Sequence, residues 1–396
     1  MTGAGLRFRD FDVAAFLRDY WQQQPLLIKS PWVSWSNPVE PDELAGLACE
    51  PLVDSRIITR REHAWELEHG PVPESRFAQA GRDPWTLLVQ SVDHHLASVA
   101  ALLDPFRFVP NWRIDDVMIS YAVDGGGVGA HFDHYDVFLV QGLGRRRWEI
   151  GALCDDDTAL LPHDGLRLLA DFQATQEWIL EPGDILYLPP RIAHRGTALG
   201  DDCMTYSIGF RAPSRSELIE AWADDITTDL PDSDRYEDPH LAQQGNPGEI
   251  SADALARLQG MIAETLHDPA RFARWFGQYN TAPKNPEIDW GPQQPVTTDD
   301  IAAHLAAGLP LIRNPASRFA FTRDSASSVL LFADGQCFVC SAETAGFAEA
   351  ICAHSALVLD EPASAVTLEL IALLVGAGSL ALDDGGSDGD WDEEAD

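Results

Sequence analysis

Short apolar segments, interrupted by glycine, proline and aspartate, fill the chain between residues 115 and 213. They are rich in β-branched and aromatic residues, which is typical of strands that pack on a pleated surface. The segments are DDVMISYAV (115–123), YDVFLVQ (135–141), RRRWEIG (145–151), EWILEPGDILYLPP (177–190) and CMTYSIGFRAP (203–213). Short strands separated this regularly by turn residues predict an antiparallel sandwich or barrel.

Helical periodicity replaces this pattern beyond Pro213. The amphipathic segments SRSELIEAWADDITTDL, SADALARLQGMIAETL and PARFARWFGQY indicate an all-helical unit over residues 214–290, whose apolar faces a partner subunit could cover. Residues 291–382 combine a helix, the hairpin SSVLLFADGQCFVC and two further helices, which favours a winged-helix-like unit. Residues 383–396 are mostly acidic, and we expect them to form a disordered tail.

The charge balance narrows the classes of partner. The 396 residues include 63 acidic and 27 basic side chains, for a formal net charge of -36. Such a surface repels nucleic acid and attracts basic proteins, although adaptation to a saline cytoplasm would give the same composition. Residues 291–396 hold three arginines, no lysine and 17 acidic residues, so direct nucleic-acid binding is not expected. The irregular cysteine spacing and the lack of a long apolar window predict a cytoplasmic protein with reduced thiols and no membrane span.

A candidate metal site begins in the segment AHFDHYD (130–136). In a strand, side chains two apart share a face, so His131 and Asp133 would point together and His134 away from them. A third ligand is expected from His194, which follows a Pro-Gly-Asp turn, an apolar strand and paired prolines. Two histidines and one carboxylate hold Fe(II) on one side and leave the opposite positions open. Taken singly, each residue has an ordinary alternative as a surface pair or a loop histidine.

Arg146 is a candidate cation inside the fold. If the chain turns at Gly142–Gly144 and then runs as a strand, Arg145, Arg147 and Glu149 share one face, expected to meet water. Arg146 would share the other face with Trp148 and Ile150. A buried guanidinium needs a partner, and its fork fits a carboxylate. The distal carboxylate of an iron-chelating 2-oxoglutarate is one candidate partner, and an internal salt bridge is the alternative.

Three further signals are assigned no catalytic function. Cys337 and Cys340 would lie on opposite faces of a strand, which disfavours a zinc site. The glycine-rich segment 124–129 precedes a strand and no helix, so it indicates a tight turn and not a nucleotide loop. The run 85–103 is interpreted as a helix in which His94 and His95 form a solvated or core-edge pair.

The segments FLRDYWQQQPLLIK, NWRIDDVMISYAVDGGGVGAHFDHYDVFLVQGLGRRRW and GDILYLPPRIAHRG together resemble the JmjC-type bacterial ribosomal oxygenases of the cupin superfamily. Members of that family hydroxylate an arginine of a large-subunit ribosomal protein. The resemblance covers nearly the whole chain and implies an α+β fold. It implies a JmjC double-stranded β-helix (cupin barrel) over 1–213, a helical dimerisation domain over 214–290 and a winged-helix-like domain over 291–382. The acidic tail, 383–396, and the scarcity of lysine depart from the family.

The resemblance also implies residue roles. Iron would be held by His131, Asp133 and His194, and 2-oxoglutarate by Arg146 and Ser120, with dioxygen as the second co-substrate. The pocket for the target side chain would be lined by Asp116, Met118, Tyr135 and Ser207, although barrel packing explains Met118 and Tyr135 equally well. The implied partners are a basic ribosomal protein and a second copy of the chain. A ribosomal histidyl hydroxylase and a non-redox metal-binding cupin remain alternatives.

Overall fold

The computed structural model describes residues 6–61, 64–79, 81, 83–325, 328–359 and 362–383. The chain divides into two compact units. The first comprises Met1–Ala212, Pro283–Arg318 and Ala353–Asp396, and the second comprises Pro213–Ala282 and Phe319–Cys352. The predicted domain boundaries at residues 213, 290 and 382 stay predictions, and nearly all of the predicted acidic tail, 384–396, lies outside the described residues. Within the described residues, no helix is long and apolar enough to cross a membrane.

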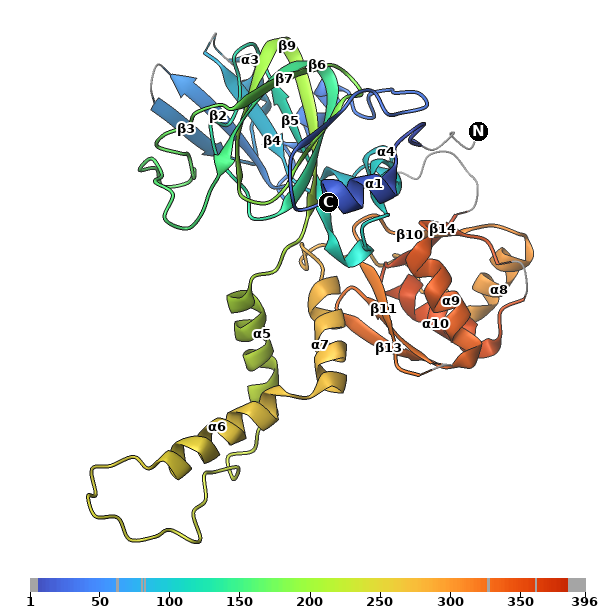
Figure 1. The fold of residues 1–396 in the computed structure, drawn as a ribbon. Helices are drawn as coiled ribbons and strands as arrows, with labels where there is room; N and C mark the ends of the chain where they lie inside the picture. Colours follow the sequence, from blue (N-terminus) through green and yellow to red (C-terminus); the bar gives the residue numbers. More distant parts are fainter. Residues whose placement is uncertain are drawn as a thin grey trace. The chain divides into compact units, whose positions relative to one another are not determined.

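A nine-stranded antiparallel sheet dominates the first unit and curves around its interior (Figure 1). The strand order is β1-β8-β6-β9-β5-β4-β2-β3, with β7 paired to β6. The strands are β1 Leu26–Ile28, β2 Ser55–Arg61, β3 Ala64–His69, β4 Trp85–Val89, β5 Ile114–Ala122, β6 Asp136–Leu153, β7 Gln176–Leu180, β8 Ile185–Leu188 and β9 Ile192–Phe210. The antiparallel, strand-rich core predicted from the apolar segments is therefore confirmed.

An aromatic core closes one side of this sheet. Helix α1 (Val13–Asp19) begins at Asp12, whose side chain accepts a hydrogen bond from the backbone N–H of Ala15 and so caps the helix. Its one buried residue, Phe16, packs against the rings of Phe138 and Tyr187, with centroids 5.4 and 4.9 Å away. Each such buried side chain contributes about 1.5–3 kcal/mol of hydrophobic free energy. This packing holds β6 and β8, and with them one wall of the barrel, in place.

Two local predictions in the first unit are wrong. The predicted turn at Gly142–Gly144 lies inside the continuous strand β6, where the register with β9 shifts on either side of Leu143. A bulge with Gly144 at φ 60° replaces the turn. The run 85–103, predicted as a helix, begins with the buried strand β4 and continues as short helical turns. A wholly buried strand in the middle of a sheet has nearly the same sequence pattern as a buried helix, which explains the error.

The remaining elements complete the two units. In the first unit they are α2 Pro41–Leu47, α3 Glu74–Ala78, η1 Val92–His94, α4 Ala97–Ala100, η2 Ala101–Phe106, η3 Asn111–Arg113, α8 Thr298–Ala306, β10 Leu311–Arg313, β14 Ala356–Leu357, α10 Ala365–Gly376 and β15 Leu380–Leu382. In the second they are α5 Arg215–Thr228, α6 Ala252–Leu266, α7 Pro269–Thr281, β11 Phe319–Arg323, β12 Val329–Ala333, β13 Gln336–Cys340 and α9 Ala342–Ala353. All three helices predicted between 214 and 290 are present, and so is the predicted hairpin, β12–β13.

Candidate metal centre and its cavity

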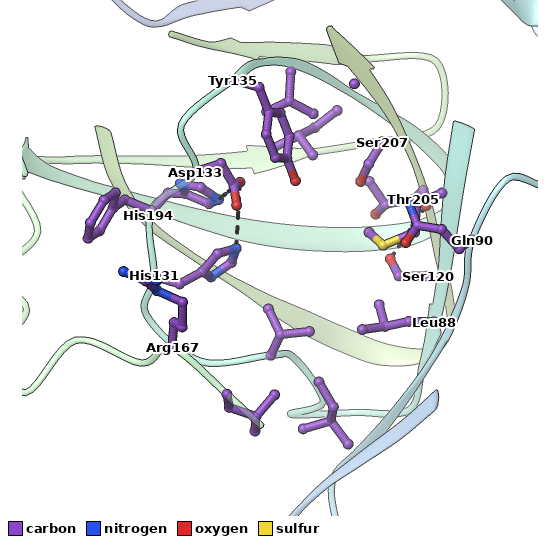
Figure 2. Close-up of a pocket in the computed structure, with 18 of the residues that line it drawn as sticks. Leu88, Gln90, Ser120, His131, Asp133, Tyr135, Arg167, His194, Thr205 and Ser207 are labelled. Carbon is purple, nitrogen blue, oxygen red and sulfur yellow. Dashed lines mark hydrogen bonds and ion pairs between the residues drawn. The ribbon is translucent and has the colours of Figure 1, made fainter. Parts of the chain in front are cut away.

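The sheet of the first unit encloses a cavity of about 510 Å³, a volume that suits a small molecule together with the end of a side chain. In Figure 2, His131, Asp133 and His194 lie on one side of this cavity, and Ser120, Thr205 and Ser207 lie on the other. Strands β5 and β9 supply the second group, because their pairing places Ser120 opposite Thr205. The cavity thus joins the predicted metal ligands to the predicted co-substrate residue.

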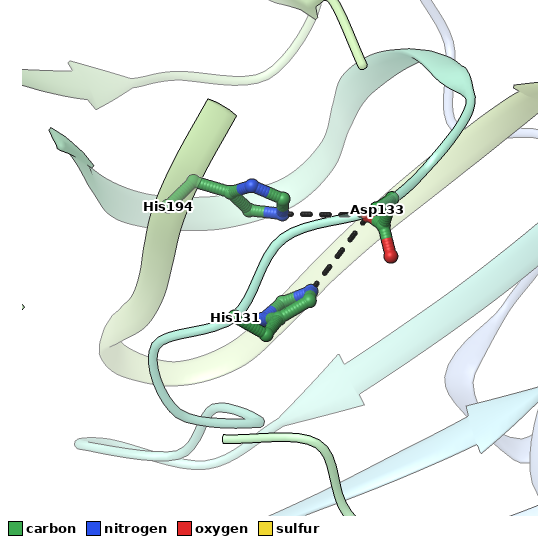
Figure 3. A group of neighbouring side chains, drawn as sticks. All are labelled: His131, Asp133 and His194. Carbon is green, nitrogen blue, oxygen red and sulfur yellow. Dashed lines mark ion pairs between the residues drawn. The ribbon is translucent and has the colours of Figure 1, made fainter. Parts of the chain in front are cut away.

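The three predicted metal ligands converge (Figure 3). One ligand atom from each of His131, Asp133 and His194 lies within 4.8 Å of the others. Asp133 Oδ2 is 3.9 Å from His131 Nε2 and 3.7 Å from His194 Nε2. His134 is exposed and does not join this group, as the sequence predicted. The cluster is the one group of potential metal-binding side chains among the described residues.

The backbone around the ligands differs from the prediction. His131 and Asp133 lie in the loop between β5 and β6 and not in a strand. The loop is fixed because the backbone N–H of His131 donates to the carbonyl of His194 (3.0 Å) and the N–H of His194 donates to that of His131 (2.9 Å). Arg191 donates in the same way to the carbonyl of Asp133 at 2.6 Å. An isolated bridge therefore aligns the ligands, without the strand alternation that we expected.

Hydrogen bonds fix the tautomers of both histidines. His131 Nδ1 lies 3.1 Å from the carbonyl oxygen of Gly129, and His194 Nδ1 lies 2.9 Å from that of Ile192. A carbonyl oxygen can only accept, so each Nδ1 carries a proton, and the Nε2 atoms are the ones that can present a lone pair to a metal. Burial, together with the neighbouring His131, lowers the pKa of His194 to about 4, so this ring is neutral at pH 7. Two imidazoles and one carboxylate, gathered on one side of an open cavity, fit Fe(II).

Arg146 lies in the same cavity and is 3 % exposed. Its buried Nε and Nη2 atoms make no hydrogen bond within the described part of the chain. The guanidinium carbon lies 5.8 Å from the ring centre of Trp148, and no described carboxylate forms an ion pair with it. A buried guanidinium with unused donors is costly unless a ligand supplies an anion. This arrangement speaks against the internal salt bridge and favours a carboxylate ligand.

The neighbours of Arg146 on β6 depart in part from the expected alternation. Arg145 is exposed, but Glu149 is buried and forms two hydrogen bonds with Arg195, at 2.7 and 2.8 Å. The expectation that Glu149 faces water is wrong, because β7 and β9 flank β6 at this position and Arg195 is its partner across the strands.

Comparison with known proteins places this site in a family. A JmjC domain matches residues 101–218, and a ROXA-like winged helix matches residues 264–381. The ribosomal protein uL16 3-hydroxylase of Escherichia coli is 40% identical over 299 residues, which cover 75% of this chain and 79% of that protein. The chain belongs to the JmjC-domain ribosomal oxygenases. A probable ribosomal oxygenase of Haemophilus influenzae is also 40% identical, over 269 residues and 66% of each chain.

Solved structures agree with the family assignment. The crystal structure of Escherichia coli YcfD has a TM-score of 0.87 and 34% identity, and the match covers 96% of this chain and 100% of that one. A structure of YcfD, named a ribosomal oxygenase, in complex with cobalt and 2-oxoglutarate has a TM-score of 0.84 and 34% identity over 95% of this chain and 99% of that one. These matches confirm the predicted α+β fold class, with a JmjC barrel and a winged helix.

All four predicted substrate residues of this ribosomal oxygenase line its cavity: Asp116, Met118, Tyr135 and Ser207. Strand pairing places Met118 opposite Ser207. Tyr135 is 42% exposed, and burial of its hydroxyl and the nearby Asp133 raise its pKa, which keeps the phenol neutral. Asp116 is buried, and its Oδ2 accepts hydrogen bonds from Ser91 Oγ at 2.7 Å and Gln90 Nε2 at 2.9 Å. Whether these side chains bind substrate stays a prediction.

Sequence reasoning missed several residues of the oxygenase cavity. Gln90, Thr205, Arg56 and Arg167 line it, and Lys284 pairs with Asp116 from outside. Thr205 was detectable, since it lies two positions before Ser207 on one strand face. The scarcity of lysine made Lys284 conspicuous but gave no hint of its partner.

Gly127 offers a test of the loop that carries His131 and Asp133. A Cβ at this position would lie 2.2 Å from the carbonyl oxygen of Gly196 on β9, and backbone cannot move aside cheaply. Gly127→Ala is expected to destabilise the ribosomal oxygenase by about 1–3 kcal/mol through overpacking. Because the loop would shift, Mn(II) affinity should fall as well. Urea unfolding and Mn(II) titration by calorimetry measure both effects.

Gly46→Ala is the matched control, because a Cβ there meets nothing within 4 Å and the residue is exposed on α2. Alanine in a helix should leave stability unchanged or raise it by up to about 1 kcal/mol. A Gly127→Ala protein as stable as the Gly46→Ala protein would contradict the close approach of this loop to β9.

Proposed function

We propose that the chain is an Fe(II)- and 2-oxoglutarate-dependent oxygenase that hydroxylates an arginine side chain of a large-subunit ribosomal protein. The observation that carries this proposal is the unpartnered guanidinium of Arg146 in one cavity with a two-histidine, one-carboxylate cluster. The relative from Escherichia coli is named for 3-hydroxylation of uL16, so uL16 is the proposed substrate and carbon 3 the proposed position.

Each residue has a defined task in this proposal. His131 and His194 present Nε2 lone pairs, and Asp133 adds the anionic ligand that balances part of the metal charge. Arg146 and Ser120, which line the same cavity, orient the distal carboxylate of 2-oxoglutarate. When bound there, Fe(II) and 2-oxoglutarate supply the oxidising chemistry that inserts one atom of dioxygen into a C–H bond. Apolar wall residues, among them Leu139 and Val137, exclude water from this reaction.

Two residues that line the cavity support a cationic substrate. Asp116 offers a carboxylate for a guanidinium, and the ring of Tyr135 offers an aromatic surface on which it can lie. The formal net charge of -36 favours encounter with a basic protein. A non-redox metal-binding cupin would have no use for the buried charge of Arg146, which makes that alternative the weaker one.

The exposed apolar side of α6 supports the proposal that the enzyme is a homodimer. Leu255, Leu258 and Ile262 are 55%, 42% and 62% exposed, and α6 buries none of its residues within the chain. Such a row of apolar side chains on one helix face fits a symmetric interface. A ribosomal protein would be met before or during ribosome assembly, so we propose the cytoplasm as the place of action.

Mass spectrometry tests the reaction directly. The full chain is incubated with Fe(II), ascorbate, 2-oxoglutarate and synthetic arginine-containing peptides of uL16, and we expect a gain of one oxygen atom on one arginine. Peptides in which that arginine is replaced by lysine or citrulline serve as matched controls and should gain none. Oxygen on a histidine, or on no peptide from any basic ribosomal protein, would contradict the proposal.

A further inference from the structure

Lys284 is one of two lysines in the chain, and its ammonium group forms an ion pair with Asp116, a carboxylate of the candidate substrate pocket. Lys284 Nζ lies 2.9 Å from Asp116 Oδ2 and 3.1 Å from Asp115 Oδ1, within the first unit. Its side chain is 23% exposed, and that of Asp116 is 4% exposed. Burial by itself would lower the pKa of Lys284, but Asp116 and Asp115 outweigh it and raise the pKa, so the ammonium stays charged.

One oxygen of Asp116 is fully occupied. Oδ2 accepts from Ser91 Oγ at 2.7 Å, from Gln90 Nε2 at 2.9 Å and from the backbone N–H of Ser91 at 3.0 Å, in addition to the contact with Lys284. Four donors exceed what one carboxylate oxygen needs, so Oδ2 has no capacity left for a ligand. Any ligand of Asp116 must therefore use Oδ1.

The other oxygen, Oδ1, accepts no hydrogen bond and forms no ion pair within the described part of the chain. Asp116 Oδ1 and Tyr135 Cε2 each lie 3.9 Å from the position that a Cβ would take at Gly209. Asp115 Cβ is 3.8 Å from the same position, so a side chain at Gly209 would occupy the space that borders this oxygen and the ring. Asp116, Tyr135 and Gly209 all line the cavity. The arrangement offers one acceptor and one aromatic ring to a flat cation such as a guanidinium.

Lys284 acts on Asp116 from outside this space. It does not line the cavity, whereas Asp115, Asp116 and Gln90 do. Asp115 is neutralised independently, because Arg211 and Arg318 lie 3.2 and 3.1 Å from its Oδ1. Among the described residues, Lys284 is the cation that forms an ion pair with Asp116.

We propose that Lys284 is a positioning residue: it holds Asp116 by Oδ2 and directs Oδ1 toward the guanidinium of the substrate. This inference rests on the proposed function, since it concerns the residue that would recognise the target arginine. Without Lys284, Asp116 would keep its neutral donors but lie beside Asp115 with no cation of its own. The buried carboxylate would then lack the opposite charge that holds its Oδ2, and its orientation toward a ligand would be less well fixed.

A binding experiment separates this inference from catalysis. The full chain, loaded with Mn(II) and 2-oxoglutarate under nitrogen, is titrated with a fluorescent uL16 peptide and with the same peptide carrying citrulline, a neutral isostere, at the target position. The ratio of the two dissociation constants isolates the charge interaction with the guanidinium. In the wild type we expect a preference for arginine of about tenfold or more, which one charge-assisted hydrogen bond supplies.

Lys284→Met and Lys284→Gln should each reduce this preference at least fivefold, and Lys284→Arg should keep it within about twofold, since it restores the cation. Affinity for Mn(II) and 2-oxoglutarate should not change in any variant. Lys29→Met is the matched control, because it removes the chain's other lysine, which pairs with Asp184 away from the cavity, and it should keep the full preference.

Two results would overturn the inference. One is an unchanged arginine preference in both Lys284→Met and Lys284→Gln, and the other is a wild type that does not distinguish arginine from citrulline. The hydroxylation assay tests the proposed reaction separately. If the Lys284 variants lose the arginine preference but the wild type adds no oxygen, the positioning role is supported and the proposed reaction is contradicted. If the variants keep the preference and the wild type adds oxygen normally, the reaction is supported and the positioning role is contradicted.

Discussion

Asp133→Ala is expected to lower both Mn(II) affinity and peptide hydroxylation by more than about 100-fold. Loss of a group that only supports a metal ligand costs about 10- to 100-fold, and this substitution removes a ligand itself. Asp133 is the one anion of the cluster, and its Oδ2 lies within 3.9 Å of Nε2 of both His131 and His194. Two neutral imidazoles alone would leave the metal with too few protein ligands and no charge compensation.

The loop should survive this substitution. Its backbone is fixed by the carbonyl of Asp133, which accepts from Arg191, and by the paired backbone bonds between His131 and His194, none of which needs the carboxylate. The matched control is His134→Ala, one residue further along the loop, where the side chain is exposed and contacts the ring of Phe132. Calorimetric Mn(II) titration and the peptide assay should find it close to wild type. An Asp133→Ala enzyme that still binds Mn(II) tightly would show that the Asp133 carboxylate is not a metal ligand.

The sequence was sufficient to predict which three side chains converge, although the local conformation that justified the prediction was wrong. Alternation along a strand paired His131 with Asp133, but in the structure a loop and an isolated bridge to His194 align them. His131 and Asp133 still lie on one side because residues two apart point the same way in any extended segment and not only in a strand of a sheet. His194 was predictable for a different reason: a turn, an apolar strand and paired prolines mark the end of a rigid element.

Long-range partners could not be predicted from local patterns. Gln90 follows a strand that was taken for part of a helix, and Lys284 lies in a linker far along the chain from Asp116. Periodicity reports which side of an element is buried, but it carries no information about which distant residue packs there. The short strands β10, β14 and β15 were not predicted for a related reason, since two or three residues are too few to show alternation.

Arg146→Met is expected to raise the Michaelis constant for 2-oxoglutarate by about 100-fold or more. A guanidinium that pairs with a carboxylate through two charge-assisted hydrogen bonds contributes about 3 kcal/mol or more, and methionine fills a similar volume without donating. The same substitution should raise the stability of the enzyme in the absence of 2-oxoglutarate by about 1–4 kcal/mol. The gain is expected because Nε and Nη2 of Arg146 are buried without hydrogen-bond partners. Methionine removes the free-energy cost of burying these donors, and it breaks no ion pair among the described residues.

These two expected changes have opposite signs, and together they separate a ligand-binding arginine from a structural one. Saturating 2-oxoglutarate should raise the melting temperature of the wild type by mass action but leave that of Arg146→Met nearly unchanged. Arg145→Met, on the exposed neighbouring position of β6, should behave as the wild type in both assays. If Arg146 were part of an internal salt bridge, methionine would lower stability by about 3–5 kcal/mol by leaving a buried carboxylate unpaired. A less stable Arg146→Met enzyme with a normal Michaelis constant would therefore show that the guanidinium serves the fold, and the assignment of the co-substrate site would fail with it.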